Sequence, residues 1–306
     1  MTNAPIRPPA VTGSVQPEGQ PTARGKLDWA TLIANRGNKF TAAYFGQAGE
    51  GKSHNLATWP NPIVFAFDPN QATLTGLLDP KRVINLGSED GYRTFYNLIR
   101  HKVFNRDLKD LEDMIGGPIE TVGLDSFTFM YDLMQGAVPI PTTNQGDDNT
   151  MAWYRQLNVQ CENILRQFCS IAQPYATDPT RPSYNFVCTL HQKDEVKQIG
   201  SGKNSQVVLD RYVPRLEGRI KNSVLSFFDT VLLCRYGKIK GPDGKDVERH
   251  YCYSVPPDRY YPGVKDGVGG EGKRFKRLPK IVGGTYPELV KAWELSETTT
   301  TNTEEG

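Results

Sequence analysis

The segment that most constrains this chain is the octapeptide GQAGEGKS, residues Gly46 to Ser53, which matches the complete P-loop pattern. The apolar run Phe40 to Phe45 precedes it and a helix start follows at Lys52, which is the strand, turn and helix context that the motif requires. In that context successive backbone N–H groups and the positive end of a helix dipole point at one small volume, which suits a nucleotide polyphosphate. The alternative is a chance glycine-rich turn before a helix, which the flanking context disfavours.

Each residue type of the motif has a physical role. The glycines let the backbone wrap phosphate oxygens without Cβ clashes, Lys52 places a charge near the terminal phosphates, and Ser53 offers a hydroxyl to Mg²⁺. We therefore expect ATP and Mg²⁺ as ligands. The predicted nucleotide contacts are Gly46, Gln47, Ala48, Gly49, Glu50, Gly51, Lys52, Ser53 and His54.

The composition is that of an ordinary globular chain. Of 306 residues, 38% are hydrophobic and 23% are charged, and a net charge of +2 neither demands nor excludes nucleic acid. No apolar run approaches the roughly 20 residues that cross a bilayer, and the N-terminus lacks the order of a signal peptide, so we expect a cytoplasmic protein without a membrane partner. The five cysteines show no metal-ligand spacing, so we expect them to be reduced and mostly buried.

The two ends of the chain differ from its middle. Residues 1–25 are rich in Pro, Thr, Gly and Gln and predict a flexible arm, and residues 296–306 predict a flexible tail. No repeat or linker divides residues 26–295, which predict one ATPase domain.

Within that middle part, strand and helix patterns alternate, which predicts an α/β fold: a mostly parallel sheet with helices on both faces. The C-terminal part is expected to add a β-hairpin, with a strand at 223–236 and a turn through 241–245. A short helix is expected at 286–295. The expected core strands cover residues 40–45, 63–67, 82–86, 120–124 and 184–190, and the expected helices start at Lys52 or cover residues 91–104, 127–134 and 151–172.

Asp125 is the carboxylate that a P-loop needs at the tip of a neighbouring strand. It directly follows the apolar residues Val122, Gly123 and Leu124, and such a carboxylate holds Mg²⁺ and orients the phosphates. We therefore predict Ser53 and Asp125 as metal ligands. The alternative is that Asp125 caps the helix that follows, since Asp is a favoured N-cap.

The residues after these strands resemble a known family. Asp125 is followed by Ser126, so the adjacent Asp-Glu pair of most AAA+ machines is missing, and a later strand stops at the polar His191. This order resembles the RecA-like P-loop ATPase core, and more closely the phage-encoded RecA-like AAA ATPases of single-strand annealing and recombination. The resemblance covers about residues 40–293, and its segments are GQAGEGKS (46–53), IVFAFD (63–68), TVGLDS (121–126), NFVCTLHQKDE (185–195), YPGVKDG (261–267) and RLPKIV (277–282).

The resemblance implies a Mg²⁺-dependent ATPase that acts on single-stranded DNA in recombination, annealing or repair, works as a homo-oligomer or filament, and resides in the host cytoplasm. It implies that His191 senses the γ-phosphate, although a strand-end histidine bonded to backbone is an equal alternative. It also implies that the loop 193–210 contacts DNA through Lys193, Lys197, Lys203 and Asn204. This stretch breaks the strand pattern with Gly and Asn and predicts a mobile loop or loose hairpin, and any exposed loop collects lysines.

Basic residues near the C-terminus are a further set. The resemblance implies that Lys265, Arg259 and Arg274 reach the nucleotide of a neighbouring subunit, as basic residues do in RecA-like filaments. The alternative is a solvated basic tail.

The chain departs from the family pattern where a catalytic Glu is expected. After the strand next to the P-loop the sequence reads Asp68, Pro69, Asn70, and Asn70 can position water but cannot take its proton. Either Asp68 or Glu89 acts as the base, or hydrolysis is slow and ATP serves as a conformational ligand.

Two other functions use the same core. A helicase, helicase loader or packaging motor would translocate or unwind, whereas an annealing protein would not. A small-molecule kinase would need a lid with arginines, for which only the basic stretch near Arg274 offers material, and the chain has no compact lid motif.

Overall fold

The computed structural model describes residues 39–100, 104–143, 146–172, 183–199, 205–240, 244–268, 275 and 277–294. The predicted arm (1–25) and tail (296–306), as well as Lys203, Asn204 and Arg274, lie outside the described residues.

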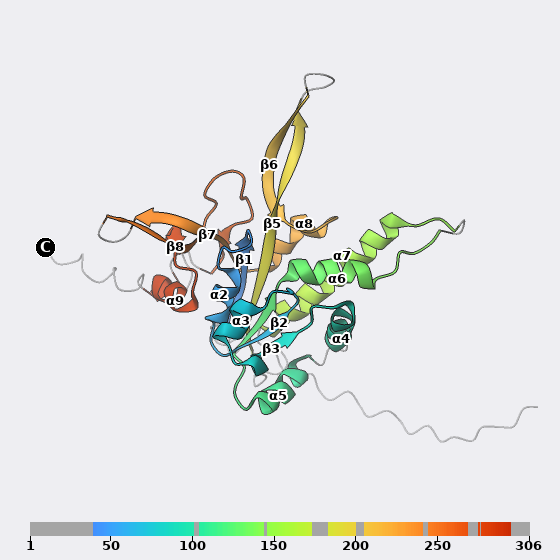
Figure 1. The fold of residues 1–306 in the computed structure, drawn as a ribbon, viewed down its shortest axis with the longest axis horizontal. Helices are drawn as coiled ribbons and strands as arrows, with labels where there is room; N and C mark the ends of the chain where they lie inside the picture. Colours follow the sequence, from blue (N-terminus) through green and yellow to red (C-terminus); the bar gives the residue numbers. More distant parts are fainter. Residues whose placement is uncertain are drawn as a thin grey trace, which may run out of the picture.

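A mostly parallel sheet forms the centre of the molecule (Figure 1). Along the sheet the parallel strands run in the order β7, β1, β5, β4, β2, β3, and β8 and β10 continue it in antiparallel fashion beyond β7. The short β9 also pairs with β7, and β6 pairs with β5. The bounds are β1 (Thr41–Gly46), β2 (Pro62–Ala66), β3 (Val83–Asn85), β4 (Thr121–Asp125), β5 (Asn185–Ile199), β6 (Gln206–Pro214), β7 (Thr230–Lys240), β8 (Asp246–Tyr253), β9 (Lys265–Asp266) and β10 (Ile281–Val282).

Helices cover both faces of this sheet, which confirms the predicted α/β fold class. On one face lie α2 (Lys52–Ala57), α3 (Ala72–Leu77) and α9 (Tyr286–Glu294), and on the other lie α4 (Glu89–Arg100), α5 (Phe104–Ile115), α6 (Phe127–Ala137), α7 (Thr150–Ile171) and α8 (Ile220–Ser223) (Figure 1). Two 3₁₀ turns, η1 (Pro80–Arg82) and η3 (Val224–Phe227), complete the described helical segments.

Strand β1 shows why the sheet needs both layers. It is buried along its whole length. Ala43 and Phe45 belong to the core under α4, α6 and α7, whereas Ala42 and Tyr44 belong to the core under α2, α3 and α9. Alternate side chains of a strand point to opposite faces, so a continuous apolar run is the expected pattern for a strand covered on both sides.

The structure corrects three expected elements. Residues 223–227, expected as the start of a strand, are helical, because a short apolar run is compatible with either a strand or a buried helical turn, and tertiary packing decides. The helix expected at 91–104 ends at Arg100, and a separate amphipathic helix, α5, begins at Phe104. Strand β5 does not stop at His191 but continues to Ile199.

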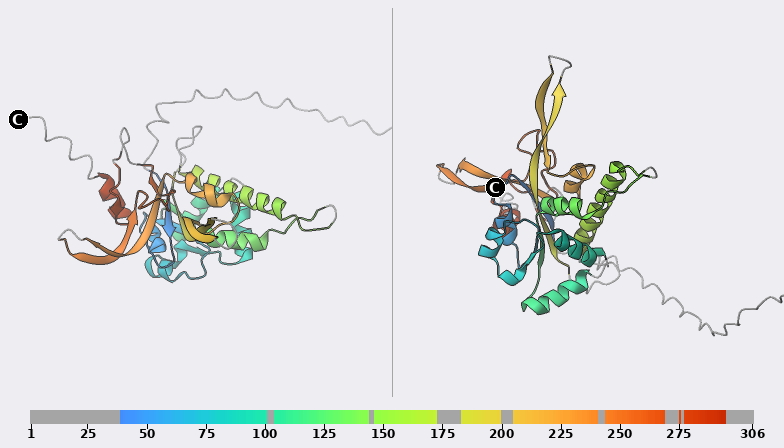
Figure 2. Two further views of the ribbon diagram at one scale, coloured as in Figure 1. Left: turned by 90° about the horizontal axis from the view of Figure 1, so that it is seen from above. Right: turned by 45° about the vertical axis from the view of Figure 1, so that its right-hand side comes forward.

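Two hairpins extend from the carboxyl edge of the sheet. The β5–β6 hairpin projects in one direction and the β7–β8 hairpin in another, as the three views show (Figures 1 and 2). Of the two forms expected for residues 193–210, a mobile loop or a loose hairpin, the described residues form an antiparallel hairpin whose register shifts between Glu195 and Val196.

Candidate functional site

The P-loop joins the end of β1 to the start of α2. Gly49 and Gly51 have φ angles of +78° and +84°, in the left-handed region that residues with a Cβ adopt only at a cost. Gly51 is the N-cap residue of α2, and it has no side chain that could accept from the N–H groups of the first helical turn. The two glycines are therefore required by the course of the backbone around the loop.

Lys52 lies inside this loop rather than in solvent. Only 5% of its surface is exposed, and its ammonium group donates to the carbonyl oxygen of Gln47. Burial lowers the pKa of Lys52, while acidic groups that include Glu50 and Asp125 oppose this shift. An ammonium group carries three N–H donors, so the bond to Gln47 leaves donors for phosphate oxygens.

Asp125 lies beside the P-loop at the end of β4. Its carboxylate is buried and accepts hydrogen bonds from the hydroxyls of Thr189 and Ser53, and burial raises its pKa. The N-cap of the following helix is Ser126, whose side chain accepts from Phe129 N at 3.2 Å. The alternative role of Asp125 as a helix cap is therefore wrong. Ser53 and Asp125 together provide the hard oxygen ligands that Mg²⁺ prefers.

Strand β5 lies between the P-loop strand and the Asp125 strand and places His191 between them. His191 is in register with Gly46, and its Nε2 lies 3.9 Å from Asp68 Oδ2. Its backbone N–H donates to Thr128 Oγ1 at 3.0 Å, so a backbone hydrogen bond and a position in the site occur together. Burial, followed by the charges of Lys52 and Arg215, lowers the pKa of His191 to about 4, so its imidazole is neutral at pH 7.

The three residues considered for the role of general base lie in different parts of the structure. Asp68 shares the site: its backbone N–H donates to Asp125 O at 3.2 Å. Asn70 is exposed, and its side chain accepts from Ala72 N at 3.4 Å at the start of α3. Glu89 packs near the far end of α6, where a Cβ on Gly136 would lie 2.5 Å from its Oε1. Among these three side chains, Asp68 is the one near Asp125 and His191.

An arginine that the sequence analysis missed lies on the other side of the P-loop. Arg235 of β7 contacts Glu50 Oε2 at 2.7 Å through Nη1, and the same oxygen accepts from Gln47 N at 2.6 Å. Arg235 also donates to Gln192 Oε1 at 3.3 Å and to the Tyr261 hydroxyl, over whose ring its guanidinium lies. Its signal in the sequence is the one that revealed Asp125 and His191: a polar residue directly after an apolar strand, here Val231 to Cys234.

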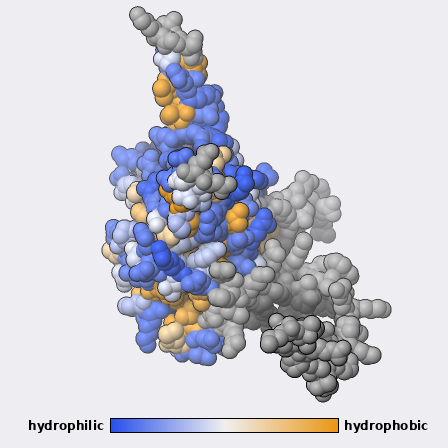
Figure 3. Space-filling view, turned by 90° about the vertical axis from the view of Figure 1, so that its right-hand side faces the viewer, coloured by the Kyte–Doolittle hydropathy of each residue, from blue (hydrophilic) through white to orange (hydrophobic). Residues whose placement is uncertain are grey.

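Of the predicted DNA contacts, Lys193 and Lys197 lie on strand β5 of the β5–β6 hairpin. Lys193 pairs with Glu217 at 2.7 Å, and Lys197 pairs with Asp210 at 2.5 Å. Apart from these ion pairs, the hairpin exposes three apolar side chains. Val196, Ile199 and Val207 are 56%, 52% and 69% accessible. Apolar surface is visible along the projecting hairpin in Figure 3.

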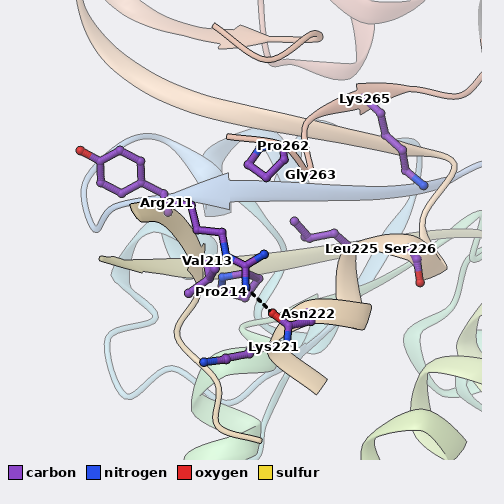
Figure 4. A pocket seen from close by; sticks show the side chains of 11 residues that line it. Arg211, Val213, Pro214, Lys221, Asn222, Leu225, Ser226, Pro262, Gly263 and Lys265 are labelled. Carbon is purple, nitrogen blue, oxygen red and sulfur yellow. Dashed lines mark hydrogen bonds between the residues drawn. The ribbon is translucent and has the colours of Figure 1, made fainter. Parts of the chain in front are cut away.

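Of the predicted contacts to a neighbouring subunit, Lys265 and Arg259 are among the described residues. Lys265 pairs through β9 with the first half of β7 and lines a cavity of about 260 Å³ that Arg211 and Lys221 also line (Figure 4). Arg259 lies over the ring of Tyr260 at 5.0 Å and lines a separate pocket with Lys197.

Comparison with known proteins gives one result. The model of a family described as AAA domain matches residues 38–263, a span that contains the P-loop, Asp125 and His191. No curated protein matches the chain. None of the helices in the described part of the chain has the length and apolar character needed to cross a membrane.

Proposed function

Because the chain belongs to the AAA domain family of P-loop ATPases, we propose that it binds and hydrolyses ATP with Mg²⁺ and uses the nucleotide to control its binding of single-stranded DNA. The observation that carries the nucleotide part is the convergence of Lys52, Ser53 and Asp125 from two separate strand ends. The DNA part extends the resemblance to phage RecA-like annealing and recombination ATPases.

The proposed chemistry follows from the positions of these side chains. Lys52 binds the terminal phosphates, and Ser53 with Asp125 holds Mg²⁺, which neutralises charge that develops on the phosphoryl group. Asp68 accepts the proton of the attacking water, because its backbone is bonded to Asp125 and its carboxylate lies 3.9 Å from His191 Nε2. His191, neutral at pH 7, orients that carboxylate without competing for the phosphates as a cation.

The nucleotide site is tested by Lys52→Ala. We expect a loss of about 1.5–3 kcal/mol in ATP binding, or about tenfold to more than a hundredfold in Kd, because a charged hydrogen-bond donor is removed. Isothermal titration calorimetry with ATP and Mg²⁺ measures it, and the exposed Lys81→Ala serves as the control. An unchanged Kd in folded Lys52→Ala protein would remove the site assignment.

The DNA proposal is supported by the continuity of β5. The strand that carries His191 beside the P-loop runs without interruption into the projecting hairpin. A change at the nucleotide therefore has a direct path to the hairpin, and we propose that Lys193, Lys197, Lys203 and Asn204 bind DNA phosphates there. Oligomerisation, with Lys265, Arg259 and Arg274 near a neighbour's nucleotide, remains part of this proposal.

The ion pairs on the hairpin allow a specific test of DNA binding. If Lys193 and Lys197 bind phosphates, their acidic partners compete with DNA, so the double variant Glu217→Gln and Asp210→Asn should bind single strands more tightly than the native protein. Replacing Lys193, Lys197 and Lys203 by Ala should weaken binding and flatten its salt dependence by about two units, at about 0.7 per phosphate.

Fluorescence anisotropy with a labelled oligonucleotide over a salt series measures both effects. A native salt slope in the triple variant would exclude the hairpin as the DNA surface. Unwinding of a duplex in the same assays would assign the chain to the motor class instead.

A further inference from the structure

An aromatic pair lies at the base of the β7–β8 hairpin. Tyr236 of β7 and His250 of β8 are cross-strand partners, and their ring centroids are 4.8 Å apart at an interplanar angle of 48°. Both residues are exposed, and 54% of the surface of Tyr236 is accessible. Exposed aromatic rings beside each other are available to stack on a further flat group.

His250 brings this pair against the P-loop. A Cβ on Gly51 would lie 3.0 Å from His250 Nδ1 and 3.1 Å from its Cγ, so the imidazole covers the backbone at the start of α2. Two residues before Tyr236 and two after His250, Cys234 and Cys252 contact Asn55 of α2, each at 3.6 Å. Alternate residues of a strand share a face, so Tyr236 and His250 lie on the face of the hairpin that faces α2.

The order of strands gives a nucleotide its direction in this site. Asp125, the proposed Mg²⁺ ligand, lies on β4, which is separated from β1 by β5. The aromatic pair lies on β7 and β8, on the opposite side of β1. A triphosphate whose terminal phosphates and metal lie toward Asp125 therefore carries its nucleoside toward the β7–β8 side.

We propose that Tyr236 and His250 form the surface that binds the base of the nucleotide. The inference rests on the proposed nucleotide site. Stacking on aromatic side chains tolerates every base because each has a flat π-face. The two-ring purines offer more area than pyrimidines, so ATP and GTP should bind more tightly than CTP and UTP.

The test compares two ligands that differ by the nucleoside: ATP and inorganic triphosphate, each with Mg²⁺, titrated calorimetrically. Tyr236→Ala should weaken ATP binding by about five- to a hundredfold, the effect of losing one stacked base, and should leave the Kd of triphosphate unchanged. Tyr236→Phe, which keeps the ring, should restore ATP binding. Val247→Ala is the control, because Val247 is an exposed residue of β8 on the opposite face of the hairpin.

The outcomes separate this inference from the proposal it rests on. If the native protein binds neither ATP nor triphosphate, the proposed nucleotide site is itself wrong. If the native protein binds both ligands, two results for Tyr236→Ala would contradict the base-binding role. One is an unchanged affinity for ATP, and the other is an equal loss of affinity for ATP and for triphosphate. His250→Ala should repeat the ATP-specific loss, and Tyr236→Ala decides the case if removal of the imidazole also disturbs Gly51.

Discussion

At the scale of single residues, Asp125 is where ATP binding and ATP turnover should separate. Asp125→Asn keeps the shape of the side chain and an oxygen that can accept from Thr189, but it removes the charge from the proposed Mg²⁺ ligands. We expect turnover to fall by at least about a hundredfold while ATP affinity falls much less, because a bound metal supplies several kcal/mol of transition-state stabilisation.

Phosphate release and calorimetry measure the two effects of this change. Asp132→Asn provides the control, since that carboxylate pairs with Arg215 on the surface of α6. Full turnover in Asp125→Asn would show that the carboxylate has no metal role.

His191 predicts a pH dependence of stability. Its pKa is about 4 in the folded protein and about 6.5 in the unfolded chain, so between these values the unfolded state binds more protons. The contribution of His191 is fully present above pH 6.5 and is lost as the pH falls to 4, by about 3 kcal/mol in all. The free energy of unfolding of the native protein and of His191→Gln should be measured with urea at pH 7 and at pH 4. Between these pH values the native protein should lose about 3 kcal/mol more than the variant. A constant difference would mean that His191 is not held neutral by its surroundings.

At the scale of elements, the distal part of the β5–β6 hairpin should be separable from the core. Its residues 196–199 on β5 are exposed and residues 208–210 on β6 are half-buried, and the ion pair of Glu195 with Arg211 lies where the shortened hairpin would end. Replacing residues 196–210 by Asn-Gly, which forms a two-residue turn, should change Tm by no more than about 3 °C and leave ATP affinity unchanged. It should abolish DNA binding if the proposed surface is correct. Loss of cooperative thermal unfolding would show instead that the hairpin supports the core.

The elements also show what the sequence could predict. Buried parallel strands are continuous apolar runs, so β1, β2, β4 and the first part of β5 could be located, and the polar residues that end the last three runs are Asp68, Asp125 and His191. The P-loop followed from its motif. These signals depend on local pattern alone.

The missed features depend on which segments become neighbours. The contact of Arg235 with Glu50 requires β7 to lie beside β1, and no local pattern fixes that pairing. The pairing of Lys193 with Glu217 has the same cause. The helical turns at 223–227 were missed for a different reason, since a short apolar run does not distinguish a strand from a buried helix.

At the scale of the whole molecule, the last described helix closes the core over the first described strand. Trp293 of α9 stacks on Phe40 at 5.1 Å and is 2% exposed, and the hydroxyl of Tyr44 donates to Gly284 O at 2.6 Å. We expect Trp293→Ala to lower the free energy of unfolding by about 3–5 kcal/mol, the usual cost of removing a buried Trp. Lys291→Ala, exposed on the same helix, should change it by about 0.5 kcal/mol or less. Urea denaturation measures both, and equal effects would place Trp293 outside the core.

The central position of β1 has a consequence for how the chain is made. Both neighbours of β1 come from far along the sequence, and the hydrogen bond from Thr41 to Asp229 joins residues 188 apart. At about 5–20 residues per second, a ribosome needs about 10–40 s to travel that distance. Asn185, the first residue of β5, comes 145 residues after Phe40, and until then β1, which is buried along its whole length in the folded protein, has neither of its partners. Contacts this distant also make sheet formation slow after release, because long loops must close before their contacts can stabilise them. We therefore expect the strand that precedes the P-loop to be prone to aggregation while the chain is being synthesised.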